Sequence, residues 1–224
     1  MRASRRPRAL LLALVAGAVA CAPGATRPPA GEPLPAALQM LFRAQFASRE
    51  GSGSLRLVLR QAGPQRYELR AADIAGRGLW RLVVVGDAGL LIDEAASRFC
   101  RPAGSVRLDS LRLPALPLAV VPRILRGQSP VPGSSPDARA AEEAGGRRWT
   151  WTATGGEVES WTLWQRGEAI AWWRRDGSTA VLSTRGGAQL RWVAAVSEPL
   201  RGPLPDLEPP AGAVEGDCGA GTIP

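Results

Sequence analysis

The chain has 224 residues, a formal net charge of +8 and a pI near 11.1, and all 28 of its basic residues are arginine. Histidine is absent as well, so the chain lacks the side chain that most often serves as a general base or a metal ligand near neutral pH. The absence of lysine excludes Schiff-base and Ser-Lys chemistry. No P-loop, dinucleotide-binding, nucleophile-elbow or C-x-x-C motif occurs. We therefore expect a protein that is not an enzyme and has no cofactor and no metal site.

The charge is unevenly distributed. The first 20 residues hold four arginines and no acid, so the remaining chain carries +4. Its arginines are scattered among apolar residues, as on a solvated face of a folded domain. We therefore expect no nucleic-acid partner.

The N-terminus has the three parts of a secretory signal. The basic stretch "MRASRRPR" precedes an apolar run over residues 9–20 that ends in small residues before Cys21. About a dozen apolar residues are too few to span a bilayer, which needs roughly 20. The run into Cys21 resembles a bacterial lipobox, and this resemblance implies cleavage before Cys21 and attachment of lipid to it. The alternative is an ordinary signal peptide followed by an incidental cysteine.

We divide the chain into four segments. Residues 1–20 are the expected lipoprotein signal peptide, and residues 21–35 are a Pro/Gly-rich tether that cannot pack a core. Residues 36–202 form the expected single folded domain, and residues 203–224 an irregular tail. Ala22 follows the cysteine where an aspartate would mark inner-membrane retention in enterobacterial lipoproteins. That resemblance implies the periplasmic face of the outer membrane.

The first element of the domain is expected to be a helix. "AALQMLFRAQFASRE" places Leu38, Leu41, Phe42 and Phe46 at helical spacing over three to four turns. Such a stripe is typical of a helix that covers a sheet.

Strands follow from residue 51. "SLRLVLRQ" and "RYELRA" alternate apolar and polar residues, as half-buried antiparallel strands do. "GLWRLVVVGDAGLLID" predicts two more strands and "SRFCRP" a short one. A short helix is expected over Leu118–Arg126, interrupted or started late at Pro122. The strands "RRWTWTAT", "EVESWTLWQ", "EAIAWWRRD", "STAVLSTR" and "AQLRWVAAV" then form a meander.

Seven of the eight tryptophans lie between Trp149 and Trp192. Aromatic residues at alternate strand positions usually form a core. A sheet of eight or more strands with only two helices to cover it has more apolar face than cover, so it curls and leaves an apolar concavity.

These segments, in this order, resemble the LolA/LolB lipoprotein-carrier superfamily. "LPLAVVPRILRGQSP" is similar to its proline-leucine helix with a glycine stop, through Leu125, Gly127 and Pro130. "QRYELRAADIAGRGLWRLVV" is similar to the strand–loop–strand of LolB-type proteins. There Ile74, Ala75 and Gly76 match an exposed apolar loop, although this loop lacks the proline.

The resemblance implies an α+β fold, a curved antiparallel half-barrel covered by two or three helices. It implies a lipid-anchored periplasmic protein that binds acyl chains, as a LolB-type acceptor does in localising lipoproteins to the outer membrane. The implied partners are lipid acyl chains or lipoproteins, the membrane through the anchor, and a periplasmic carrier protein. The candidate acyl-chain site comprises sheet and lid residues: Leu57, Leu69, Trp80, Trp149, Trp151, Trp161, Leu163, Trp172, Trp192, Leu41, Phe42, Ile124 and Leu125.

Two of these assignments stay open. Trp172 and Trp173 point to opposite faces of a strand, and the pattern does not decide which one points inward. The function has an alternative, a non-catalytic scaffold or accessory lipoprotein of an envelope assembly whose groove is filled by side chains. A hydrolase is a distant third.

Cys100 and Cys218 remain once Cys21 carries lipid. An even number of thiols in an oxidising compartment favours a disulfide, which here would hold the Pro/Gly-rich tail against the domain. The alternative is two unpaired thiols.

Overall fold

The computed structural model describes residues 37–107, 113–131, 140–143, 147–154 and 157–218. One sheet of 13 strands dominates it, in the spatial order β15-β6-β5-β4-β3-β2-β1-β14-β13-β12-β11-β10-β9, and β7 and β8 pair separately. Neighbouring strands in the large sheet are antiparallel except for the parallel pair β15 and β6.

Strands β2–β6 and β10–β14 follow the strands predicted from the sequence, whereas β1, β7–β9 and β15 were not predicted. The first group is β1 (Ala37–Ser48), β2 (Gly51–Ala62), β3 (Arg66–Asp73), β4 (Gly78–Val85), β5 (Ala88–Asp93) and β6 (Arg98–Cys100). The short elements β7 (Ser105–Val106), β8 (Leu116–Pro117) and α1 (Val121–Leu125) come next. The second group is β9 (Ala140–Glu143), β10 (Arg147–Thr154), β11 (Glu157–Gln165), β12 (Glu168–Asp176), β13 (Thr179–Thr184), β14 (Gln189–Pro199) and β15 (Val214–Glu215).

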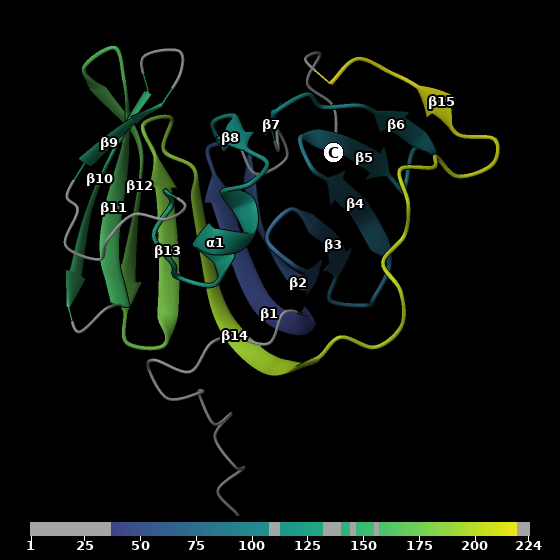
Figure 1. Cartoon of the computed structure of the whole chain (residues 1–224), viewed down its shortest axis with the longest axis horizontal. Coiled ribbons are helices and arrows are strands. Elements are labelled where there is room, and N and C mark those ends of the chain that lie inside the picture. Colours follow the sequence, from purple (N-terminus) through teal and green to yellow (C-terminus); the bar gives the residue numbers. More distant parts are fainter. Residues whose placement is uncertain (1–36, 108–112, 132–139, 144–146, 155–156, 219–224) are drawn as a thin grey trace, which may run out of the picture.

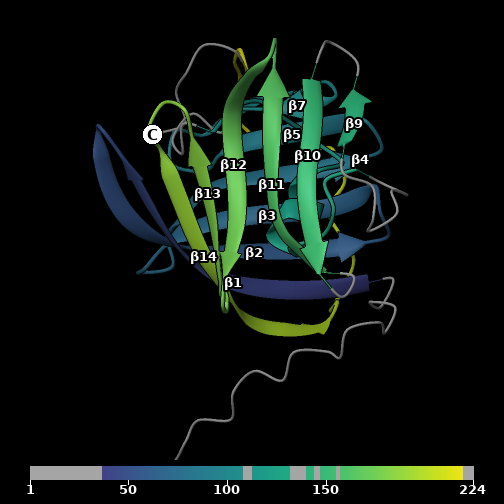
Figure 2. The ribbon, with the colours of Figure 1, turned by 90° about the vertical axis from the view of Figure 1, so that its left-hand side faces the viewer.

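The sheet curls until its two halves face each other, with α1 between them (Figure 1). Figure 2 shows β10–β13 in front of β2–β5, whose strands run across them. One buried cluster joins residues of β2–β5, of β10–β14 and of α1. The predicted curved antiparallel sheet is therefore present, and its inner face forms the core.

The predicted N-terminal helix is wrong, because residues 37–48 form strand β1. Leu38, Phe42 and Phe46 are four residues apart, which fits both a helical stripe and one face of a strand. Pairing decides between the two: β1 lies between β2 and β14 and pairs with β2 along its whole length. Those long-range contacts override the helix propensity of Ala, Leu, Gln and Met.

The prediction of two or three covering helices is also wrong. Within the described residues the only α-helix is α1, which has five residues. It is the expected helix in shortened form. Pro122 lies in its first turn, where the fixed φ of proline suits a helix start. Gly127 follows with φ 68°, a left-handed conformation that ends a helix readily only at glycine.

Candidate functional site

The inner face of the sheet collects most of the predicted site residues. Eleven of the 13 belong to the single buried cluster of this face: Phe42, Leu57, Leu69, Trp80, Ile124, Leu125, Trp149, Trp151, Trp161, Leu163 and Trp192. They come from both halves of the sheet and from α1. Phe42 belongs to strand β1, so the prediction that it comes from a helical lid is wrong.

Two predicted residues point the other way. Trp172 is 41% exposed, whereas Trp173 is only 1% exposed and lies in the buried cluster. Trp173 is the tryptophan that faces inward, and Trp172 is excluded from this face by the alternation of the strand. Leu41 is excluded in the same way, because its neighbours Met40 and Phe42 pack on the inner cluster and Leu41 lies between them on the outer face.

Three tryptophans on adjacent strands are in ring contact. Trp149 and Trp161 meet edge to face with ring centroids 5.0 Å apart, and Trp161 and Trp173 are stacked at 6.4 Å. Trp151 lies opposite Trp161 in the register of β10 and β11. Aromatic pairs of this kind add stability beyond the area they bury. Together these four residues form the wall contributed by β10–β12.

The indole N–H groups of this wall have no acceptor. The Nε1 atoms of Trp149, Trp151, Trp161 and Trp173 are buried and make no hydrogen bond within the described residues. A buried donor without a partner costs about 1–3 kcal/mol. The wall therefore presents several polar donors to an interior that is otherwise apolar.

Residues 113–131 cover the inner face. Tyr67 Oη donates a 2.8 Å hydrogen bond to the carbonyl oxygen of Leu118, and Trp192 Nε1 donates a 3.2 Å bond to that of Leu125. Arg126 donates from one terminal nitrogen to Oε1 of Gln61 at 2.8 Å. Val121, Ile124 and Leu125 add apolar contacts. A short segment held by a few side-chain bonds thus closes the concave side.

Ionisable groups in and below this cover are perturbed by burial. Burial raises the pKa of Tyr67 far above its ordinary value of 10.0. Burial also lowers the pKa of Arg123 and Arg126, and the nearby charge of Arg123 lowers that of Arg126 further. In this structure Tyr67 and Arg126 are hydrogen-bond donors that attach the cover to the sheet.

The inner face is closed off from solvent, since the four tryptophans of the wall are at most 3% exposed. An open depression of about 440 Å³ lies elsewhere, at the β1–β2 hairpin beside β14. Its lining includes Gln45, Phe46, Ser52, Ser54, Gln189 and Arg191. It is partly polar and does not reach the tryptophan wall.

The turn between β3 and β4 presents an apolar side chain to solvent. Ile74 is 70% exposed, and Ala75 and Gly76 beside it are exposed too, as expected from the sequence. Asp73 accepts hydrogen bonds from the backbone N–H of Arg77 at 2.9 Å and from its Nε at 2.6 Å. These bonds, the side-chain bond first, hold the pKa of Asp73 below its ordinary value. The turn is built tightly around an outward-facing isoleucine.

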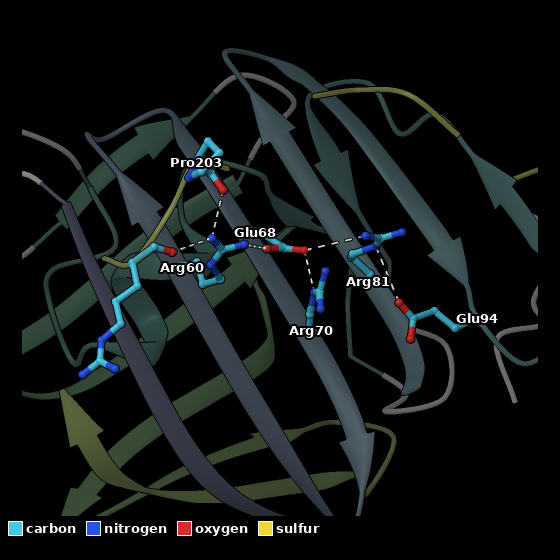
Figure 3. A network of polar contacts seen from close by, with 7 residues as sticks. Arg60, Glu68, Arg70, Arg81, Glu94 and Pro203 are labelled. Atoms are coloured by element: carbon cyan, nitrogen blue, oxygen red, sulfur yellow. Dashed lines mark hydrogen bonds and ion pairs between the residues drawn. The ribbon is translucent and has the colours of Figure 1, made fainter. Parts of the chain in front are cut away.

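The outer face of β2–β4 holds a network of charges (Figure 3). Glu68 is fully buried and accepts hydrogen bonds from Arg60 at 2.7 Å and from Arg70 at 2.6 Å, with Arg81 3.9 Å away. Arg60 also donates to the carbonyl oxygens of Arg201 and Pro203. The network therefore fastens the start of the tail to the sheet.

The tail continues over the outer face to the sheet edge. Leu207 and Ala213 pack on a small cluster of Val83, Leu90, Ile92 and Phe99. Beyond β15, Cys218 forms a disulfide with Cys100, with Cα atoms 5.3 Å apart. The structure thus contains the cysteine pairing expected from the sequence. Residues 203–218 are irregular apart from β15.

Within the described residues, no cluster of three or more His, Cys, Asp or Glu side chains could hold a metal ion. No described helix is long and apolar enough to cross a membrane. Cys21 and the expected signal and tether lie outside the described residues.

Several important residues were not identified from the sequence. Trp173 could be chosen over Trp172 only from the strand register. The sequence did contain a signal that Tyr67 faces inward, because Tyr67, Leu69 and Ala71 occupy alternate positions on one apolar face. The sequence contained no signal that Glu68 is buried, since a lone acid between two arginines is typical of a solvated position.

No protein-family model matches the sequence, and no curated protein matches it. Two solved structures are similar in fold. A LolA superfamily protein from Nitrosomonas europaea has 10% identity and a TM-score of 0.46, and the match covers 75% of this chain and 87% of that one. An outer membrane lipoprotein-sorting protein domain from Vibrio parahaemolyticus has 7% identity and a TM-score of 0.43, with the same coverage of 75% and 87%.

Proposed function

We propose that this chain is a lipid-anchored envelope lipoprotein that shields acyl chains on the inner face of its curled sheet. The observation that carries the proposal is the composition of that face. Both walls are lined by tryptophan and leucine, and the described cover is one short segment, residues 113–131. Shielding an acyl chain requires an apolar concavity and no reactive group, and this chain has neither histidine nor lysine.

Displacement of the cover would give a ligand access. It would break the bonds from Tyr67 and Trp192 to the cover backbone and uncover Ile124 and Leu125. The unpartnered indole N–H groups support the proposal, because the ester oxygens of a diacyl lipid are acceptors that could reach them once the cover has moved. An acyl chain would replace the apolar contacts of the cover with its own.

The more specific proposal is a LolB-type acceptor at the periplasmic face of the outer membrane. Its cargo would be lipoproteins, received from a periplasmic carrier protein. The exposed Ile74 supports contact with a membrane at the β3–β4 turn, because an isolated apolar tip is costly to leave in water. Cys21 would carry the lipid, and residues 22–35 would tether the domain.

The scaffold alternative is favoured by one specific observation. The inner face is closed off from solvent, so a protein that never opens would have the same structure. In that case the functional surface would lie elsewhere and the tryptophan wall would only provide a core.

Lipid binding can be measured on the chain from residue 22, secreted through a cleavable signal that adds no lipid. We expect native mass spectrometry after detergent-free purification to show a bound diacyl lipid. After its removal, a fluorescent acyl probe should quench tryptophan emission. Replacement of Trp161 by Phe should reduce the quenching, and the matched control Trp172→Phe should not. No bound lipid and no quenching at saturating probe would favour the scaffold.

The anchor requires its own test. In a bacterium with the lipoprotein pathway, Cys21→Ser should give a soluble or unprocessed protein. A processed Cys21→Ser protein that still fractionates with membranes would contradict lipid attachment at this residue.

A further inference from the structure

A continuous stripe of arginines crosses the outer face of five neighbouring strands. Arg43 of β1 lies directly opposite Arg56 of β2, and Arg70 of β3 lies opposite Arg81 of β4. The strand registers place Arg56 diagonal to Arg70 and Arg43 diagonal to Arg191 of β14. We call these five residues the arginine stripe. Neighbours of this kind on one face lie about 5–8 Å apart between Cβ atoms.

The carboxylates near the stripe do not balance it. Arg70 and Arg81 share Glu68, and Arg81 also lies 3.6 Å from Glu94. Figure 3 shows Arg60, Glu68 and Arg81 in a row across the strands, with Arg70 and Glu94 beside it. Among the described residues, Arg43 and Arg56 have no carboxylate partner, and Arg191 donates only to Gln189. With Arg60, six arginines face two carboxylates, which gives this surface a net formal charge of +4.

Most of the stripe is exposed to solvent. Arg43, Arg56, Arg70 and Arg191 are all exposed, whereas the tail that covers part of the outer face is attached at Arg60 and at Arg66. Like charges directly opposite each other on a sheet are destabilising, so the facing pair Arg43 and Arg56 does not stabilise the sheet. The planar guanidinium group instead suits phosphate, which it binds with two parallel hydrogen bonds.

We propose that the arginine stripe is a docking surface for anionic phospholipid headgroups. Its arginines repeat from strand to strand at a spacing of about 4.8 Å, which suits many mobile phosphates better than a single shaped partner. The exposed Ile74 and Arg77 follow directly on β3, the strand that carries Arg70. The turn and the stripe would therefore meet one bilayer, with an apolar tip at the end of a cationic face.

The orientation of the domain with its stripe toward the bilayer rests on one part of the proposed function, the lipid anchor at Cys21. Strand β1 begins 16 residues after Cys21, so the tether spans at most about 55 Å. A domain held that close to a membrane experiences it at high effective concentration, and a weak electrostatic surface is then sufficient to orient it.

The test is vesicle binding by the unlipidated chain from residue 22, which separates the stripe from the anchor. Vesicles of 30% phosphatidylglycerol in phosphatidylcholine are compared with pure phosphatidylcholine at low ionic strength. We expect binding to the anionic vesicles only, and loss of that binding as salt is raised. Replacing Arg43, Arg56 and Arg191 together by Gln should weaken binding roughly 10- to 100-fold.

The matched control removes three exposed arginines elsewhere, Arg49, Arg98 and Arg166. This control variant should bind within about twofold of the unmodified chain, and both variants should keep the acyl-probe response. Equal loss in the two variants would show that net charge alone acts and would overturn the proposal. Binding that is unaffected by the stripe variant, or no binding to anionic vesicles, would overturn it as well. Loss of the acyl-probe response in the unmodified chain would instead contradict the proposed function.

Discussion

The two faces of the same strands differ sharply in chemistry. On β2–β4 the inner positions hold Leu57, Leu69 and Trp80, all buried in one apolar cluster. The alternating outer positions hold Arg56, Arg70 and Arg81, and the last two share the buried carboxylate of Glu68. Because side chains alternate along a strand, one short sequence can specify an apolar interior and a cationic exterior. We infer that the inner face binds the acyl chains of lipids and that the outer face binds lipid headgroups.

The largest expected effect is on stability, and it distinguishes a tryptophan of the inner face from one of the outer face. Trp161→Ala removes a side chain that is only 1% exposed and that contacts two other rings, so it should lower the free energy of unfolding by about 3–5 kcal/mol. Trp172→Ala on the outer face should lower it by less than about 1 kcal/mol. Urea titrations followed by circular dichroism measure both values. Similar losses in the two variants would contradict the assignment of faces.

The next largest effect on stability is expected from the disulfide that holds the tail against the outer face. The disulfide between Cys100 and Cys218 closes a loop with a sequence separation of 118. Replacing both cysteines by Ser should therefore lower the free energy of unfolding by about 2–4 kcal/mol. The tail should also become sensitive to protease, which mass spectrometry of the fragments would reveal. An unchanged unfolding midpoint, with a tail that still resists protease, would mean that Arg60 and Leu207 suffice to hold it.

A smaller effect is expected at the centre of the outer-face network. Glu68→Gln leaves Arg60 and Arg70 without their buried carboxylate and should cost about 2 kcal/mol, less than a fully buried pair because both arginines keep access to water. Glu94→Gln is the control, since this carboxylate is partly exposed and should contribute less than about 1 kcal/mol. Thermal unfolding of both variants measures these two losses of stability. A stabilised Glu68→Gln protein would show that the buried carboxylate is a net cost.

The smallest effect is a dependence on alkaline pH that comes from the inner face. Burial raises the pKa of Tyr67, so the unfolded chain loses this proton near pH 10 while the folded chain keeps it. Stability should therefore fall above about pH 10, by about 1.4 kcal/mol per pH unit. The chain has one tyrosine and no lysine, and the lowered pKa values of Arg123 and Arg126 act in the opposite direction, so Tyr67→Phe should abolish this fall in stability. A slope that persists in Tyr67→Phe would contradict this assignment.

The sequence predicts most of the sheet because alternation is a strong local signal. Strands β2–β5 and β10–β14 follow directly from it. Strand β1 could not be predicted, since residues four apart satisfy both periods and only pairing with β2 and β14 selects the strand. The choice between Trp172 and Trp173 failed for a related reason, because face assignment depends on the register with β11 and β13.

The clustering of arginines on the outer face could not be predicted from the sequence. Arg43, Arg56 and Arg70 look like scattered solvated residues along the chain, and no cluster of basic residues stands out. The registers of three strands bring them together. The inner cluster, in contrast, is visible as a run of tryptophans between Trp149 and Trp192. Local composition therefore identified the apolar face, whereas the cationic face required the fold.

The central claim is that an acyl chain occupies the inner face beneath residues 113–131. It is tested most directly by photo-crosslinking, with a diacyl lipid that carries a diazirine near the end of one chain. The lipid is incubated with the chain from residue 22, irradiated, and its attachment sites are mapped by peptide mass spectrometry. The account predicts labels on inner-face residues of β10–β12 and on α1, in competition with unlabelled diacyl lipid. Labels confined to the outer face or to the Ile74 turn, or none that compete, would contradict it.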